Sequence, residues 1–403
     1  MSDDFYRIKR LPPYVIAEVN TLRHAARQAG RDIVDLGMGN PDLPPPRHVI
    51  DKLCEVAAKP DAHGYSQSRG IPGLRRAQAN YYARRFGVAV DPEREVVVTM
   101  GSKEGLASLA TAITAPGDVV LAPNPSYPIH TFGFIIAGAT IRSVPTTPDE
   151  NYFRSLERAM AFTVPRPSIL VVNYPSNPTA ETVDLAFYER LVGWARENQV
   201  WVISDLAYSE LYYDGNPTVS ILQVEGAKDV AIEFTSLSKT FSMAGWRIGF
   251  AVGNPRLIAA MTRVKSYLDY GAFTPVQAAA CAALNGPQDI VEKNRRLYHK
   301  RHDVLVEVFG RAGWDIPPPR ASMFAWAPLP PALAHMGSLE FSKQMLEHAD
   351  VAVAPGVGYG EDGEGFVRIA LVENEQRLRQ AARNVRRWFQ QMGLNTGAGR
   401  EAG

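Results

Sequence analysis

A single lysine, Lys239, lies among small and hydroxyl-bearing residues in the segment SLSKTFSMAGWRIG, residues 236–249. Small residues allow a bulky group to come close to the backbone. Ser236 and Ser238 offer hydroxyl donors, and Arg247 offers a planar cationic fork, so these side chains suit a phosphate group. A lysine beside a phosphate site favours a Schiff base to a phosphorylated aldehyde, and pyridoxal phosphate (PLP) is the commonest such cofactor. The alternative is a solvated surface charge, which describes most lysines.

Two further segments place polar groups at the ends of apolar runs. Gly101, Ser102 and Lys103 open a helix, where free backbone N–H groups and the helix dipole favour a phosphate. The same residues also fit an ordinary capped helix start. Asp205 ends another run, at the edge where open α/β sheets bind ligands, although acidic residues are common at strand ends.

An asparagine and an arginine complete the candidates. Asn177 lies in an Asn-Pro turn, which is compatible with a purely structural role. Arg368 is a lone charge inside the apolar run FVRIAL, residues 366–371, and a charge in such a place needs a partner. A salt bridge would satisfy it, and so would a ligand carboxylate, which a guanidinium fork matches well.

The elements that carry these residues indicate an α/β fold. Longer helix-like segments, such as 103–113, 185–197 and 255–267, separate most of the apolar runs, and this alternation predicts a mainly parallel central sheet flanked by helices. Continuous apolar runs favour strands covered on both faces. The predicted strands are residues 95–99, 118–122, 140–144, 168–173, 200–204, 230–235 and 248–252.

A second pattern begins after about residue 290 and predicts a smaller α+β domain. It consists of a helix, three short strands and a further helix, at residues 294–312, 323–327, 351–354, 367–371 and 374–392. Pro12-Pro13 and Pro44–Pro46 exclude one continuous helix at the N-terminus. The predicted division is residues 1–49 as an N-terminal arm and part of the small domain, 50–290 as the large domain, 291–394 as the small domain, and 395–403 as a flexible tail.

Composition narrows the class of protein. The 403 residues include 43 basic and 42 acidic side chains, and this balance disfavours a nucleic-acid or anionic-membrane partner. The two cysteines, Cys54 and Cys281, form no CxxC pair, so neither a zinc site nor a disulfide framework is expected, and no metal is predicted. The N-terminus lacks a signal-peptide pattern, and no apolar run approaches the roughly 18 residues of a membrane span. We expect a soluble, cytoplasmic protein.

Residues 236–249 match the PLP-lysine signature of the class I/II aminotransferases, of fold type I, and the chain resembles that family along nearly all of its length. The resemblance implies that Lys239 forms the imine with PLP and, once freed, moves the substrate Cα proton. It further implies cofactor contacts and substrate contacts at matching positions. The implied cofactor residues are Gly101, Ser102, Lys103, Tyr127, Asn177, Asp205, Tyr208, Ser236, Ser238 and Arg247, with Tyr65 reaching the phosphate of a neighbouring subunit; the implied substrate residues are Gly39, Asn177 and Arg368.

Several strings resemble the alanine transaminase branch of bacteria, which implies glutamate plus pyruvate giving 2-oxoglutarate plus alanine. The chain departs from the family pattern at Asn173-Tyr174, outside the catalytic positions, and no second arginine for the glutamate γ-carboxylate is identifiable. A shared active site implies a homodimer. The strings are RLPPY at 10–14, GYS at 64–66, SRGIP at 68–72, DYG at 269–271 and MGSLEF at 336–341.

Other readings remain open at this point. Aspartate or diaminopimelate aminotransferases would share the same residues, and so would a PLP-dependent C–S lyase or decarboxylase. The effector domain of a transcription regulator would need a preceding DNA-binding module, and the aminotransferase pattern already begins near residue 11. A nucleotide-binding oxidoreductase would need a GxGxxG turn between strand and helix, and the sequence does not place one.

Overall fold

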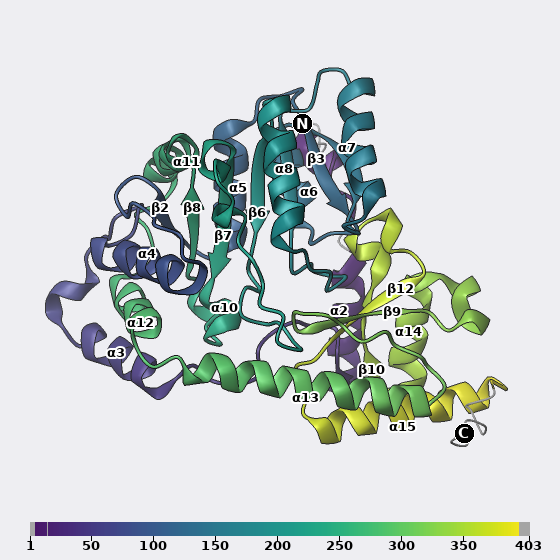
Figure 1. Cartoon of the computed structure of the whole chain (residues 1–403). Coiled ribbons are helices and arrows are strands. Elements are labelled where there is room, and N and C mark those ends of the chain that lie inside the picture. Colours follow the sequence, from purple (N-terminus) through teal and green to yellow (C-terminus); the bar gives the residue numbers. More distant parts are fainter. Residues whose placement is uncertain (1–4, 14, 395–403) are drawn as a thin grey trace.

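The computed structural model describes residues 5–13 and 15–394, and its centre is a seven-stranded sheet in the order β2-β8-β7-β6-β5-β3-β4 (Figure 1). Only β8 runs antiparallel to its neighbours β2 and β7; the other pairs are parallel. The mainly parallel sheet predicted from the sequence is therefore confirmed. The strands are β2 (Val96–Thr99), β3 (Val119–Asn124), β4 (Thr140–Pro145), β5 (Ile169–Asn173), β6 (Trp201–Asp205), β7 (Ala231–Ser236) and β8 (Gly249–Gly253).

Helices cover both faces of this sheet, because successive side chains of each strand enter opposite cores. Val96 and Val98 pack in a core with residues of α4 and α8, whereas Val97 between them packs with residues of α5 and α11. The result is three layers. The first face is covered by α4 (Pro72–Phe86), α7 (Glu150–Phe162), α8 (Leu185–Asn198) and α12 (Thr274–Asn285), and the second by α5 (Ser102–Ile113), α6 (Ile129–Ala137) and α11 (Pro255–Leu268).

A second hydrophobic core is formed mainly by the last hundred residues of the chain together with its N-terminal segment. An antiparallel sheet in the order β11-β12-β9 contains β9 (Phe324–Pro328), β11 (Ala354–Pro355) and β12 (Phe366–Ala370). The strand β1 (Val34–Asp35) pairs with β10 (Val351–Ala352), which joins the N-terminal segment to this part of the molecule. The helices here are α2 (Val15–Gln28), α13 (Asp289–Arg311), α14 (Gly337–Ala349) and α15 (Glu375–Gln391).

The helix α13 connects the two parts of the molecule. Figure 1 shows it running from beneath α12 to lie beside α15. The predicted strand 351–354 is split, because β10 pairs with β1 whereas β11 pairs with β12. The domain boundaries proposed from the sequence stay predictions, and the proposed tail, 395–403, lies outside the described residues. Short helices complete the fold: α1 (Tyr6–Lys9), α3 (Arg47–Ala57), α9 (Ala227–Val230) and α10 (Leu237–Thr240).

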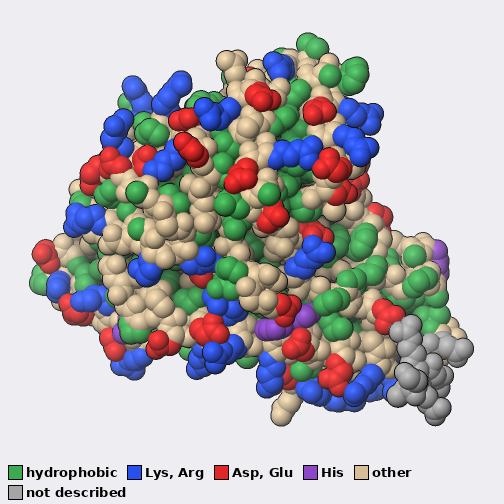
Figure 2. Space-filling view, viewed as in Figure 1, with side chains coloured by type: hydrophobic (Ala, Val, Ile, Leu, Met, Phe, Trp, Pro, Cys, Tyr) green, Lys and Arg blue, Asp and Glu red, His purple; other side chains and the backbone are tan. Residues whose placement is uncertain are grey.

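The surface carries mixed charge on the face seen in Figure 2, where blue and red side chains are interspersed. None of the helices in residues 5–13 and 15–394 combines the length and the apolar character that a membrane crossing needs.

Candidate active site

A cavity of about 860 Å³ opens where the parallel strands β5 and β6 end, between the large sheet and the residues of β12 and the N-terminal segment. It brings together residues that are up to 357 positions apart in the chain, from Ile16 to Glu373. Nearly all of the sequence-predicted site residues line it. They are Gly39, Ser102, Lys103, Tyr127, Asn177, Asp205, Tyr208, Ser236, Ser238, Lys239, Arg247 and Arg368.

Lys239 projects into this cavity from α10, a single helical turn that directly follows β7. The Ser236 side chain caps the turn by accepting a hydrogen bond from the Ser238 backbone N–H at 3.1 Å. The Lys239 ammonium donates to the Gly39 carbonyl at 2.5 Å. Burial, and then the charges of Arg368 and Arg247, lower the pKa of Lys239 to about 7. A large part of the lysine population is therefore a neutral amine at physiological pH, as a nucleophile or base requires.

Donors for an anion converge on the start of α5. Ser102 is the first residue of that helix, so its backbone N–H is free of intrahelical partners. Gly101, at φ +84°, has no side chain, and a Cβ there would lie 2.1 Å from Arg247 Nη2. The glycine thus lets the guanidinium approach the helix start, which adds a fixed positive charge to the N–H groups. The Lys103 ammonium lies 5.6 Å from the centre of the Tyr127 ring.

A carboxylate lies at the end of β6. Asp205 Oδ1 accepts a hydrogen bond from the Ala207 backbone N–H at 3.2 Å, and Oδ2 lies 2.8 Å from His130 Nε2. His130 is fully buried, and its Nδ1 has no hydrogen-bond partner among the described residues. The sequence analysis missed His130, which is 75 positions from Asp205. Its ring lies 6.0 Å from that of Tyr127, which precedes α6, and nothing in the surrounding apolar sequence singles it out.

Arg368 of β12 is the candidate for binding a substrate carboxylate. Arg368 donates to Asn177 Oδ1 at 3.0 Å and to the Gly37 carbonyl at 2.8 Å, and its guanidinium lies 4.1 Å from the centre of the Phe324 ring. Its Nε has no hydrogen-bond partner among the described residues. A Cβ on Gly39 would lie 2.5 Å from that Phe324 ring, so only glycine fits there. No carboxylate of the described residues forms an ion pair with Arg368, which leaves the charge for a ligand.

Three tyrosines were predicted at the site, and two of them line the cavity. Burial raises the pKa of Tyr208 and of Tyr127, so both phenols keep their protons and can donate them in hydrogen bonds. Tyr65 lies outside the cavity of its own chain: it is 88% exposed, and its ring lies 4.5 Å from that of Tyr270. Gly101 likewise does not line the cavity, but it lies against Arg247, which does.

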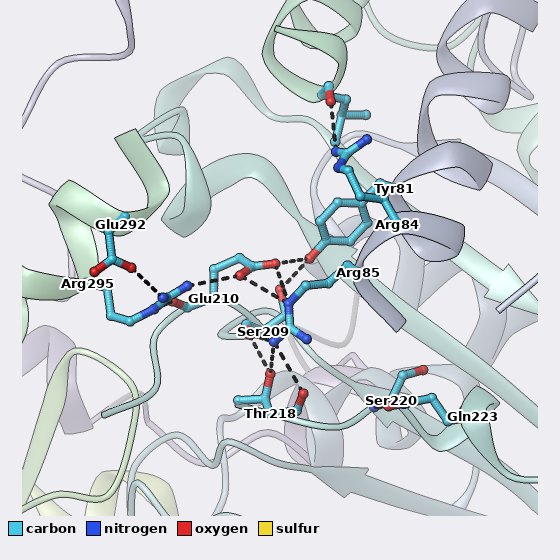
Figure 3. A network of polar contacts seen from close by, with 11 residues as sticks. Tyr81, Arg84, Arg85, Ser209, Glu210, Thr218, Ser220, Gln223, Glu292 and Arg295 are labelled. Carbon is cyan, nitrogen blue, oxygen red and sulfur yellow. Dashed lines mark hydrogen bonds and ion pairs between the residues drawn. The ribbon is translucent and has the colours of Figure 1, made fainter. Parts of the chain in front are cut away.

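The segment that follows Asp205 and Tyr208 is fixed by a buried ion network, shown in Figure 3. Glu210 accepts from the Tyr81 hydroxyl at 2.6 Å and pairs with Arg85 at 3.1 Å and with Arg295 at 3.5 Å. Tyr81 and Arg85 belong to α4, whereas Arg295 belongs to α13. The carboxylate therefore ties the segment that leaves the site both to the large sheet's helix layer and to the connecting helix.

The residues present fit PLP on their own chemistry. Free N–H groups, hydroxyls and Arg247 suit the phosphate, a fixed carboxylate suits a protonated ring nitrogen, and a buried amine with a pKa near 7 suits the aldehyde. Arg368 supplies a separate place for a carboxylate. One cavity therefore brings together groups that suit this cofactor and a group that suits the carboxylate of an amino acid.

Residues 31–385 match the model of the aminotransferase class I and II family. The chain belongs to this family, and it is a PLP-dependent aminotransferase with the fold type I architecture.

Individual relatives agree along nearly the whole chain. The sequence is 61% identical to AatC of Rhizobium meliloti (strain 1021), covering 96% of each chain. It is 52% identical to the glutamate-pyruvate aminotransferase AlaC of Escherichia coli (strain K12), covering 97% of this chain and 95% of that protein. The substrate-bound BacF structure from Bacillus subtilis is similar with a TM-score of 0.90 and 33% identity, over 99% of this chain and 100% of that chain.

Proposed function

We propose that this aminotransferase exchanges amino groups between glutamate and pyruvate, giving 2-oxoglutarate and alanine. The similarity to the glutamate-pyruvate aminotransferase of Escherichia coli, 52% over 390 residues, carries this proposal. The LL-diaminopimelate aminotransferase of Moorella thermoacetica is more distant, at 42% over 381 residues. Diaminopimelate and aspartate are therefore the second-ranked amino donors, and a lyase or decarboxylase reaction ranks below them.

We assign the phosphate of PLP to Gly101, Ser102, Lys103, Ser236, Ser238 and Arg247, and its ring to Tyr127, Asn177, Asp205 and Tyr208. When bound, the cofactor supplies an electron-withdrawing ring that stabilises negative charge at the substrate Cα. Asp205, oriented by Ala207 and His130, would hold the ring nitrogen of the cofactor and favour its protonated form. Asn177 and Tyr208 donate hydrogen bonds to an ionised ring oxygen.

Lys239 and Arg368 act on the amino acid itself in this proposal. Arg368 holds the α-carboxylate by two N–H donors, which fixes the orientation of the Cα–H bond. The Gly39 backbone borders the same space. Burial and two arginines lower the pKa of Lys239 to about 7, so its amine can be neutral. The neutral amine would take the proton from the substrate Cα and pass it to C4′ of the cofactor. The residue is thus both the anchoring amine and the proton carrier.

Arg27 is our candidate for the side-chain carboxylate of glutamate, a role for which the sequence offered no residue. It extends from α2 and lines the same cavity as Lys239 and Arg368. Its guanidinium lies 3.5 Å from Asp35 Oδ2, but the same oxygen is held more closely by Arg23, at 2.7 Å. The Arg27 side chain is 45% exposed, which leaves it free to turn toward a substrate.

We also propose a homodimer with shared active sites, in the cytoplasm. An exposed aromatic patch supports the dimer: Tyr65, Tyr267 and Tyr270 are 88%, 83% and 61% exposed, which is unusual for rings of this size. A second copy of this chain is the occupant we assign to the patch, because Tyr65 is the residue implied to reach a neighbouring cofactor. The cytoplasmic location remains the expectation drawn from the sequence.

The test is a screen of single half-reactions. The purified holoenzyme is mixed with one amino acid at a time, and conversion of the cofactor to its amine form is followed by absorbance. Glutamate and alanine should both convert it, whereas aspartate and diaminopimelate should be at least about tenfold slower in kcat/KM. Faster conversion by either of those two would contradict the donor assignment, and release of thiol or carbon dioxide without conversion would indicate a lyase or decarboxylase.

The variant Arg27→Ala separates the two substrates. Loss of a charge-assisted contact of about 1.5–3 kcal/mol should lower kcat/KM for glutamate by roughly 10- to 100-fold and leave alanine within about twofold. Equal losses for both substrates would show that Arg27 does not recognise the side chain.

A further inference from the structure

Two histidines and an aspartate gather on one side of α13, away from the active-site cavity. His299, His302 and Asp303 each offer one ligand atom, and these atoms all lie within 4.8 Å of one another. A second carboxylate, Asp214, approaches from the segment after β6, with its Oδ1 at 3.5 Å from His299 Nε2. Figure 2 shows histidine and acidic side chains side by side at the surface over α13. None of these four residues belongs to the catalytic machinery described above.

The spacing of the ligand atoms fits a small divalent ion. Ligands held at 2.0–2.1 Å by a tetrahedral zinc ion lie about 3.4 Å apart. Three successive pairs already have such separations: His302 Nδ1 to Asp303 Oδ1 is 3.2 Å, Asp303 Oδ1 to His299 Nε2 is 3.8 Å, and His299 Nε2 to Asp214 Oδ1 is 3.5 Å. Small side-chain rotations would complete the site, because Asp214 and Asp303 are largely exposed.

His302 is the observation that points to a ligand. The residue is 7% exposed, and neither of its ring nitrogens has a hydrogen-bond partner among the described residues. Although its Nδ1 lies 3.2 Å from Asp303, the two groups do not form a hydrogen bond. A buried polar atom without a partner destabilises the folded state. A metal ion would use the free lone pair of Nδ1 and draw the carboxylates inward.

We propose that His299, His302, Asp303 and Asp214 form a site for a divalent transition-metal ion of the Zn²⁺ type. Imidazole and carboxylate ligands suit this class, whereas Mg²⁺ and Ca²⁺ prefer all-oxygen sites. Cysteine spacing could not indicate this site, because it contains no cysteine.

The ion would fasten two segments that the active site depends on. Asp214 lies in the segment after β6 that also contains Tyr208, and the histidines belong to α13, which connects the two parts of the molecule. The Tyr213 ring stacks on both imidazoles, with centroids at 5.0 and 5.8 Å, and its hydroxyl donates to the Ser322 carbonyl. Bound metal should therefore stabilise the folded protein, since it binds the folded state only.

Titration calorimetry with ZnCl₂ on the untagged holoenzyme tests the site. We expect one ion per chain, binding weakened more than about tenfold in His299→Ala and in Asp303→Asn, and a higher Tm with zinc that these variants lack. Both side chains are partly or largely exposed, so the variants should fold, and their transamination without zinc should equal that of the wild type.

Two matched controls distinguish this site from other zinc ligands. His348→Ala removes an exposed histidine of α14, and Cys54→Ser removes an exposed thiol; both should bind zinc like the wild type. MgCl₂ should give no saturable binding. Any one of three results would overturn the proposal: no saturable zinc binding by the wild type, unchanged zinc affinity in His299→Ala, or loss of zinc binding in Cys54→Ser.

Discussion

The protonation of Lys239 depends on its burial and on the charges of two arginines, Arg368 and Arg247. Burial is the largest cause of its lowered pKa, and Arg368 is the next. The neutral amine is the nucleophile, so PLP uptake by the cofactor-free protein should rise with pH, with a midpoint near 7, and level off above it. In Arg368→Gln the midpoint should move to higher pH, because a neighbouring positive charge is removed. Stopped-flow absorbance measures this; a wild-type midpoint near 10 would contradict the assignment.

Residue types, together with the resemblance to the aminotransferase family, were enough to predict many of the residues that line the cavity. Asp205 and Arg368 stand out because each ends or interrupts an apolar run, where a charge requires a reason, and Lys239 stands out because it lies among small and hydroxyl-bearing residues. His130 and Arg27 do not stand out in this way. His130 belongs to an apolar helix, and Arg27 belongs to an amphipathic one with many charges. Their roles arise from contacts across the fold, such as the 75-residue separation between His130 and Asp205, which no local pattern encodes.

The elements around the site depend on buried charges that the sequence does not reveal. Glu210 joins α4 and α13 through Arg85 and Arg295, and all three side chains are at most 19% exposed. Glu210→Ala would leave two arginines without their partner, so unfolding free energy should fall by about 3–5 kcal/mol. Glu292→Ala is the control. Its carboxylate is 45% exposed, so removing it should lower the unfolding free energy by at most about 1 kcal/mol. Denaturant unfolding gives both values, and equal losses would mean that the network does not hold these helices together.

A carboxyl group inside β7 should make stability depend on pH. Burial raises the pKa of Glu233 from 4.5 to about 7, although Ser220, Tyr82 and Ser204 all donate hydrogen bonds to it. Between these two pH values the folded chain keeps a proton that the unfolded chain has released. Stability should therefore fall as pH rises from about 4.5 to 7, by roughly 3 kcal/mol from this group alone.

Glu233→Gln isolates this effect, since glutamine does not titrate. Between pH 4.5 and 7.5 the unfolding free energy of the wild type should fall by about 3 kcal/mol more than the unfolding free energy of this variant. Glu197 is exposed, so the unfolding free energy of Glu197→Gln should depend on pH in the same way as that of the wild type. Parallel curves for wild type and Glu233→Gln would show that the carboxyl group ionises normally.

At the scale of the elements, the seven strands of the central sheet were predicted within two residues at each end, because all of them except the exposed strand β4 are buried apolar runs. The reversed direction of β8 and the separate pairing of β10 and β11 were not predicted. Strand direction and partner are set by tertiary packing, and a strand of two residues carries too little pattern to indicate either.

The whole molecule in our proposal is a dimer whose sites each use Tyr65 of the other copy. Mixed dimers test this. Lys239→Ala and Tyr65→Ala should each lose activity, and mixing them should restore part of it, because one site then receives an intact Lys239 and an intact Tyr65. Mixing Lys239→Ala with Asp205→Ala should restore none, because those two residues line the cavity of a single chain. Recovery in both mixtures, or in neither, would contradict the shared site.

The central claim is that the Lys239 amine binds the cofactor, and borohydride reduction tests it most directly. The holoenzyme is reduced, digested and sequenced by mass spectrometry. We predict one pyridoxyl group per chain, on Lys239 in the peptide that contains residues 236–247. A label on Lys103, which also lines the cavity, or no label at all would contradict the account.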